Sequence, residues 1–163
     1  SLMFPKELTE LTNKLISSCR NQDIKIATAE SCTGGLIAGC LTSISGSSDV
    51  FERGFNTYSN NAKVEMLDVP IDMIIAHGAV SETVAIAMCE GALKNAPVQL
   101  TVSVTGIAGP AGGTHEKPVG TVYIASARDG RDTVSKCYIF DGNRDKIRVS
   151  TIKRAIEIML SQV

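Results

Sequence analysis

The chain has 163 residues, of which 44% are hydrophobic and 20% are charged, and its formal net charge at pH 7 is −1. These values are typical of a single globular domain over residues 1–163, and they exclude the strongly basic composition that binds nucleic acids or anionic membranes. No apolar run reaches the roughly 18 residues of a membrane span and no charged-then-apolar leader opens the chain, so we expect a cytoplasmic protein.

The cysteines point to a protein with reduced thiols. There are five of them, an odd number, without CxxC pairs. Together with the histidines and carboxylates they show no metal-ligand spacing, so we predict no metal and no cofactor. Ser1 and Leu2 precede Met3, and one interpretation is that they were added ahead of the natural start.

The first half of the chain predicts alternating helices and strands. A helix is expected over 5–19, because Leu8, Leu11, Leu15, Ile16 and Cys19 share one face. It is followed by a short strand, a helix of small residues and a strand interrupted by Gly54, over 24–28, 32–41 and 50–58. Asn60 and Asn61 can cap a short helix that ends near Leu67, and a further helix is expected over 81–94.

The second half predicts a strand, a loop, a hairpin and a final helix. The strand over 99–105 runs into a glycine-rich loop over 106–114. Strands over 119–127 and 133–140 are joined through Asp129-Gly130, a typical hairpin turn. The last helix begins near Arg144. Because helices and strands interleave throughout, we predict an α/β layered domain with a mixed sheet.

The motif from Ala29 to Gly35 (AESCTGG) joins a predicted strand to a predicted helix. The first N–H groups of a helix lack partners, and its dipole favours negative charge there. Ser31 thus lies where its hydroxyl could attack a carbonyl, while N–H groups around Cys32 to Gly34 hold the oxyanion. The alternative is that Ser31 only caps the helix.

Lys63 is the candidate base for such a serine. In the first turn of its predicted helix it lies near the positive end of the dipole, and burial would lower its pKa further. A neutral lysine can accept the serine proton, and Tyr58 could orient or relay it. The alternatives are an exposed helix lysine and a half-buried packing tyrosine.

The glycine-rich loop that follows Thr105 could offer N–H groups to a phosphate at the carboxyl end of a strand. Lys117 and Arg144 could supply positive charge to it. The alternatives are a flexible connector and two solvated cations. Cys32 could be reactive at a helix N-terminus, but we interpret it as a backbone donor and packing residue, because nothing nearby in the sequence pairs it with a histidine.

These motifs resemble the CinA C-terminal domain family, the PncC-like nicotinamide-nucleotide amidohydrolases. Three blocks carry the resemblance, TAESCTGG at 28–35, YSNNAK at 58–63 and TGIAGP at 105–110, the last continuing to KPVGTV at 117–122. The resemblance spans nearly the whole chain from about Glu7. It implies a three-layer α/β/α domain, commonly a homodimer, that deamidates nicotinamide mononucleotide in pyridine nucleotide recycling.

The resemblance also implies the roles of individual residues. Ser31 resembles the nucleophile, and Lys63 with Tyr58 resembles its activating pair. Substrate-binding roles are expected for Glu30, Cys32, Thr33, Gly34, Gly35, Thr105, Gly106, Ala108, Gly109, Lys117 and Arg144.

One segment departs from the family pattern. The strand before Tyr58 reads Phe51-Glu52-Arg53-Gly54-Phe55, where the family often has paired glycines, so we expect a different pocket wall there. The rival function is a catalytically silent module that binds a nucleotide with the same glycine-rich loops. A DNA-binding role, suggested by the competence-related family name, has no basic footprint in this chain.

Overall fold

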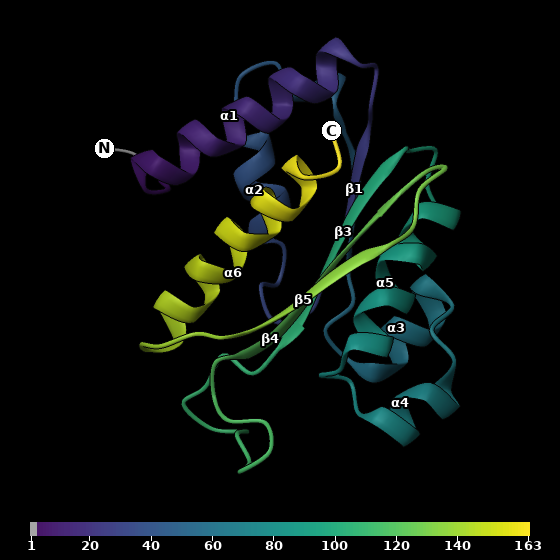
Figure 1. Ribbon diagram of the computed structural model, residues 1–163, viewed down its shortest axis with the longest axis vertical. Coiled ribbons are helices and arrows are strands. Elements are labelled where there is room, and N and C mark those ends of the chain that lie inside the picture. The colour runs from purple at the N-terminus through teal and green to yellow at the C-terminus, as the bar shows by residue number, and fades with distance from the viewer. Residues whose placement is uncertain (1–2) are drawn as a thin grey trace.

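The computed structural model describes residues 3–163, so the interpretation of Ser1 and Leu2 lies outside the described residues. Figure 1 shows a central sheet between two groups of helices. In chain order the elements are α1 (Lys6–Asn21), β1 (Ile26–Glu30), α2 (Leu36–Thr42), a 3-10 turn (Ser47–Asp49), β2 (Phe51–Asn56), α3 (Asn60–Leu67), α4 (Ile71–His77), α5 (Glu82–Lys94), β3 (Leu100–Gly106), β4 (Thr121–Arg128), β5 (Val134–Ile139) and α6 (Arg144–Leu160).

The sheet is mixed, as predicted. Its five strands follow the order β2-β1-β3-β4-β5. β1 runs parallel to both β2 and β3. β4 runs antiparallel to β3 and forms an antiparallel hairpin with β5. The carboxyl ends of β1, β2 and β3 therefore meet at one edge, which is where ligands bind in open α/β sheets.

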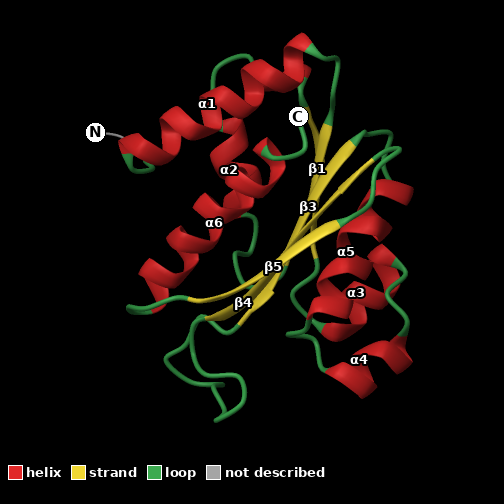
Figure 2. Cartoon of the chain, in the orientation of Figure 1, coloured by secondary structure: helices red, strands yellow, loops and turns green. Residues whose placement is uncertain are grey.

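Helices cover both faces of the sheet, which confirms the three-layer α/β/α prediction. α1, α2 and α6 lie on one face and α3, α4 and α5 lie on the other (Figures 1 and 2). The larger apolar core lies under the first group and includes Leu15, Ile26, Leu100 and Ile156. β1 and the first six residues of β3 are buried on both sides, as expected for strands in the middle of such a sandwich. No helix among the described residues is both long and apolar enough to cross a membrane.

The structure corrects several predicted boundaries. The helix expected over 32–41 begins only at Leu36, because Gly34 and Gly35 have φ values of +58° and +106° that interrupt a helix. The cap of α3 is Ser59, whose hydroxyl accepts from the Ala62 N–H, and not Asn60 or Asn61. α4 was not predicted at all, since its isoleucines do not form one buried stripe: Ile74 is buried while Ile75 is 75% exposed.

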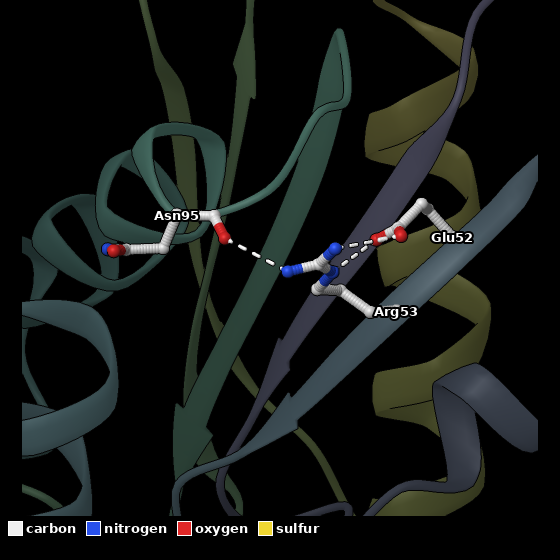
Figure 3. Close-up of polar contacts among 3 residues, drawn as sticks. All are labelled: Glu52, Arg53 and Asn95. Carbon is white, nitrogen blue, oxygen red and sulfur yellow. Dashed lines mark hydrogen bonds and ion pairs between the residues drawn. The ribbon is translucent and has the colours of Figure 1, made fainter.

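The strand that departs from the family pattern lies at the edge of the sheet. Figure 3 shows Arg53 donating to both carboxylate oxygens of Glu52 and to the Asn95 carbonyl oxygen, 3.4 Å away. The guanidinium thereby joins the edge strand β2 to the residue that ends α5. An exposed ion pair of this kind contributes little to stability, but its charges make the edge less suited to pairing with another strand.

Candidate active site

A pocket of about 200 Å³ opens at the carboxyl ends of β1 and β3. Residues from the two strand ends, the loop after β3, the β2–α3 connection, α3 itself, the segment before α5 and the start of α6 surround it. They are Ser31, Cys32, Tyr58, Asn60, Lys63, Ala79, Val80, Thr105, Gly106, Ala108 and Arg144. Its basic side chains are Lys63 and Arg144 and none of the lining side chains is acidic, so the pocket favours an anionic or electron-rich ligand.

Ser31 and Lys63 meet in this pocket. The Lys63 Nζ lies 3.0 Å from the Ser31 Oγ, although the two residues are 32 positions apart in the sequence. The main chain holds Ser31 in place, because its N–H donates to the Val104 carbonyl oxygen of β3. Ser31 accepts no N–H from α2 among the described hydrogen bonds, so the interpretation of this serine as a helix cap is wrong.

Lys63 is buried, with only 1% of the residue exposed. Its Nζ also contacts the carbonyl oxygens of Thr57, at 2.9 Å, and Tyr58, at 3.2 Å. The alternative of an exposed helix lysine is therefore wrong. Burial lowers the pKa of Lys63 below its ordinary value of 10.5, because the charged form loses hydration; the nearby Cys32 opposes this effect.

The three oxygens around Nζ suit both protonation states of the amine. A charged amine has three hydrogens for the three acceptors, and the Ser31 hydroxyl can then donate to the Tyr58 carbonyl oxygen at 3.4 Å. A neutral amine gives its two hydrogens to the two carbonyls and directs its lone pair at Ser31 Oγ. In the neutral state the geometry thus fits a base that accepts the serine proton.

Tyr58 contributes to this arrangement through its main chain. Its carbonyl oxygen contacts Nζ, whereas its residue is 65% exposed and its hydroxyl accepts from an Arg144 nitrogen at 3.4 Å. The half-buried packing position is wrong. The contact of Tyr58 with Lys63 is made by its carbonyl oxygen, and its hydroxyl contacts Arg144 instead. The structure places the Tyr58 side chain at the pocket mouth.

Cys32 also lines the pocket, but its environment opposes a role as nucleophile. Burial raises the pKa of its thiol to about 12, so the reactive thiolate is scarce at neutral pH. Among the described residues, no group of three or more His, Cys, Asp or Glu side chains could hold a metal ion.

Four of the predicted substrate-binding residues around the turn do not line the pocket: Glu30, Thr33, Gly34 and Gly35. Glu30 is fully buried, and its carboxylate accepts from the Gly35, Ile37 and Ala38 N–H groups at the start of α2. These bonds satisfy the first N–H groups of α2, whereas the N–H groups of Cys32 and Thr33 make no bond to Glu30. We therefore revise the role of Glu30 from substrate contact to support of the turn.

Of the substrate-binding residues predicted in and after the glycine-rich loop, some line the pocket and others do not. Thr105, Gly106 and Ala108 line the pocket, whereas Gly109 and Lys117 do not. The Thr105 hydroxyl donates to the Ala79 carbonyl oxygen at 2.9 Å. The Lys117 amine donates to the carbonyl oxygens of His77 and Val80, so it fastens the loop to the segment before α5.

Arg144 lies across the mouth of the pocket. One guanidinium nitrogen donates to the Gly109 carbonyl oxygen at 2.7 Å, and another reaches the Tyr58 hydroxyl. The side chain remains exposed, so it can still contact a ligand at the mouth. This one residue links α6, the glycine-rich loop and the β2–α3 connection.

Sequence reasoning missed three pocket residues, Asn60, Ala79 and Val80. Asn60 was interpreted only as a cap, although YSNNAK would have placed it one turn before Lys63. Ala79 and Val80 carry no chemical signal of their own. The expected difference in the pocket wall at 51–55 is not observed, because no residue of β2 lines the pocket.

The chain is similar to proteins of one family. The family model described as the CinA C-terminal domain matches residues 8–163. A CinA-like protein of Syntrophobacter fumaroxidans is 51% identical over 140 residues, which cover 86% of this chain and 33% of that protein. The nicotinamide-nucleotide amidohydrolase PncC of Escherichia coli K12 is 43% identical over 160 residues, covering 98% of this chain and 97% of that protein.

A solved structure agrees with these sequence similarities. The competence/damage inducible protein CihA from Agrobacterium tumefaciens superposes with a TM-score of 0.96 at 42% identity, covering 99% of this chain and 98% of that one. The chain spans only 33% to 38% of the length of the first four CinA-like relatives.

Proposed function

The chain belongs to the CinA C-terminal domain family, and we propose that it is an amidase that deamidates nicotinamide mononucleotide to nicotinic acid mononucleotide and ammonia. The single observation that carries the proposal is the 3.0 Å contact between a buried lysine and a serine hydroxyl inside a pocket. The similarity to the E. coli amidohydrolase supports the choice of substrate.

The reaction proceeds through an acyl-enzyme. Neutral Lys63 takes the Ser31 proton, and the Ser31 Oγ attacks the carboxamide carbon. The proton then passes from Nζ to the departing nitrogen, the C–N bond breaks and ammonia leaves. A water molecule, deprotonated by the same amine, hydrolyses the ester and returns the hydroxyl to Ser31.

The turn that follows Ser31 supplies donors for the oxyanion. The Gly34 N–H already donates to the Ser31 carbonyl oxygen and the Gly35 N–H donates to Glu30. The N–H groups of Cys32 and Thr33 are the remaining donors of the set expected from the sequence. Loss of one such donor typically lowers the rate on the order of a hundred- to a thousandfold.

The size of the pocket suits the carboxamide end of the nucleotide, and the charge at its mouth suits the phosphate end. A volume of about 200 Å³ lies below the range of roughly 300–1,000 Å³ for whole-ligand sites, so it suits the carboxamide-bearing part of the substrate. The phosphate then lies at the mouth, where Arg144 supplies positive charge.

The test is ammonia release from nicotinamide mononucleotide by the purified protein and by Ser31→Ala. We expect turnover by the parent and a loss of at least about a thousandfold in the variant, because the nucleophile is gone. Nucleotide binding, measured by calorimetry, should persist. Ammonia release by Ser31→Ala at the parent rate contradicts the mechanism, and binding by the parent without any turnover favours the silent binding module instead.

The resemblance also implies a homodimer, and light scattering of the purified protein tests that state. A monomer at micromolar concentration contradicts it.

A further inference from the structure

The turn that carries the proposed nucleophile, residues 31–35, is held from two sides by opposite charges. We call this segment the nucleophile turn. On its inner side Glu30 accepts four hydrogen bonds with its two carboxylate oxygens: from the Thr33 hydroxyl at 2.5 Å, and from the N–H groups of Gly35, Ile37 and Ala38 at 2.9 to 3.2 Å. A buried carboxylate needs such a set of donors, and it joins the turn to the first residues of α2.

On its other side the nucleophile turn is bound by Arg148 of α6. The Arg148 Nε donates to the Cys32 carbonyl oxygen and a terminal nitrogen donates to the Thr33 carbonyl oxygen, both at 3.3 Å. Arg148 is 116 positions away from Cys32 in the sequence. It does not line the pocket, so its contact with the site passes through the main chain of the turn.

The two charges act on successive peptide groups of one turn. In a planar trans peptide, the carbonyl of one residue and the N–H of the next point in opposite directions. A cation on the carbonyls of Cys32 and Thr33 thus fixes the direction of the N–H groups of Thr33 and Gly34. It also polarises those peptides, since hydrogen bonds in a chain strengthen one another.

The nucleophile turn has a reason to need this support. Gly34 and Gly35 both adopt positive φ, and glycine restricts the backbone less than any other residue. α2 begins only after them, so no helical hydrogen bond holds Ser31. The main-chain bonds of Ser31 to Val104 and of Gly34 to Ser31 are few, so side chains that contact the turn add to its support.

We propose that Glu30 and Arg148 are positioning residues, which together hold the nucleophile turn so that Ser31 Oγ faces Lys63 Nζ. This inference rests on the proposed function where it is tested by substrate turnover, but not where it is tested by chemical labelling of Ser31. Displacement of a reacting group by about 1 Å can reduce the rate on the order of a hundredfold. Neither residue lines the pocket, so we expect substrate binding to change little when either is replaced.

The experiment compares Glu30→Gln, Arg148→Met, Arg148→Lys and the double variant Glu30→Gln/Arg148→Met with the parent. Lys153→Met is the matched control, because Lys153 also belongs to α6 but pairs with Glu7, away from the pocket. Two readouts are taken: kcat and KM for nicotinamide mononucleotide, and the rate at which a fluorophosphonate labels Ser31, followed by intact mass. Circular dichroism identifies the folded variants.

We expect kcat to fall about ten- to a hundredfold in Glu30→Gln and Arg148→Met, with KM within about threefold of the parent value. Labelling of Ser31 should slow in parallel. The pH midpoint of the residual activity should not move, because Lys63 is intact. Arg148→Lys should recover part of the loss, and the double variant should lose less than the product of the two single losses, because both residues act on one turn.

The outcomes separate this inference from the proposed function. A parent that labels but does not release ammonia, with slower labelling in the variants, supports the positioning role and contradicts the amidase. Folded variants that turn over substrate and label at the parent rate overturn the positioning role and leave the amidase standing. If Glu30→Gln or Arg148→Met does not fold, Arg148→Gln, which also removes the cation, decides: parent-like turnover and labelling in this folded variant overturn the inference. A parent that neither labels nor turns over contradicts both.

Discussion

The floor and the rim of the pocket present two very different environments for charge. The floor consists of buried residues, Ser31, Cys32, Lys63 and Thr105, and its amine is surrounded by protein oxygens. The rim consists of exposed residues, Tyr58, Asn60 and Arg144. A buried amine loses hydration and becomes a base at lower pH, whereas an exposed guanidinium stays charged and can bind an anion.

Under the proposed mechanism, the pocket separates chemistry from recognition by depth. A lysine at the rim would remain protonated and could not accept the serine proton. An arginine at the floor would remain charged at any accessible pH. Changes at the floor should therefore reduce kcat, and changes at the rim should raise KM.

The largest effect after loss of the nucleophile is expected for Lys63→Met. Methionine has a similar length and no lone pair that accepts the serine proton, so kcat should fall at least about a hundredfold. The measurement is ammonia release in the steady state. Lys14→Met, on the exposed face of α1, is the matched control and should retain parent activity. Activity of Lys63→Met near the parent value contradicts lysine as the base.

The second prediction concerns pH. Because burial lowers the pKa of Lys63, kcat/KM of the parent should rise with pH through one ionisation below 10.5 and then level off. The charged form is disfavoured in the folded state only. Burying the charged Lys63 therefore costs stability, and this cost is largest below the pKa of Lys63 in the folded state. The cost disappears as the pH rises from that pKa toward the pKa of lysine in the unfolded chain.

The free energy of unfolding checks this sign directly. The difference between the parent and Lys63→Met should shift in favour of the parent as the pH rises through that window, measured by urea denaturation at several pH values. A difference that stays constant with pH contradicts a lowered pKa. A shift in favour of Lys63→Met as the pH rises indicates a raised pKa of Lys63.

The rim predicts a smaller effect of a different kind. Arg144→Gln removes the positive charge at the mouth, so KM for nicotinamide mononucleotide should rise about tenfold while kcat changes less than about threefold. The corresponding nucleoside, which lacks the phosphate, should show no such rise. Lys146→Gln is the matched control, since it removes a cation from the same first turn of α6 outside the pocket. An equal rise for nucleotide and nucleoside contradicts phosphate binding by Arg144.

The sequence predicted the fold and the floor of the pocket better than the rim. Apolar periodicity gave the sheet, the hairpin and most helices, because those patterns reflect burial directly. The position of Ser31 at the end of a strand was also readable from the order of elements. The sequence could not show that Glu30 would take the N–H groups at the start of α2, since a buried carboxylate and a ligand-binding one look alike in a motif.

Residues that act across long separations were the least predictable. Arg148 contacts a turn 115 to 116 positions earlier, and an arginine in an amphipathic helix carries no mark of such a contact. Tyr58 was expected to orient or relay the serine proton; in the structure its carbonyl oxygen contacts Lys63, and its hydroxyl accepts from Arg144 at the mouth. Only the path of the chain between β2 and α3 determines which of these two groups faces the floor.

The smallest effect is expected for Cys32→Ala. This variant distinguishes the Ser31 hydroxyl from the Cys32 thiol as the nucleophile on the pocket floor. Burial raises the pKa of the Cys32 thiol to about 12, so the side chain fills space and does not react. Alanine preserves the backbone N–H, which is the group proposed to bind the oxyanion, and kcat should stay within about threefold of the parent. Removal of a small buried side chain should lower the free energy of unfolding by about 1 kcal/mol, measured by urea denaturation. If a folded Cys32→Ala variant loses as much activity as Ser31→Ala, the thiol takes part in the chemistry. The proposal that Ser31 reacts and its neighbour Cys32 does not is then wrong.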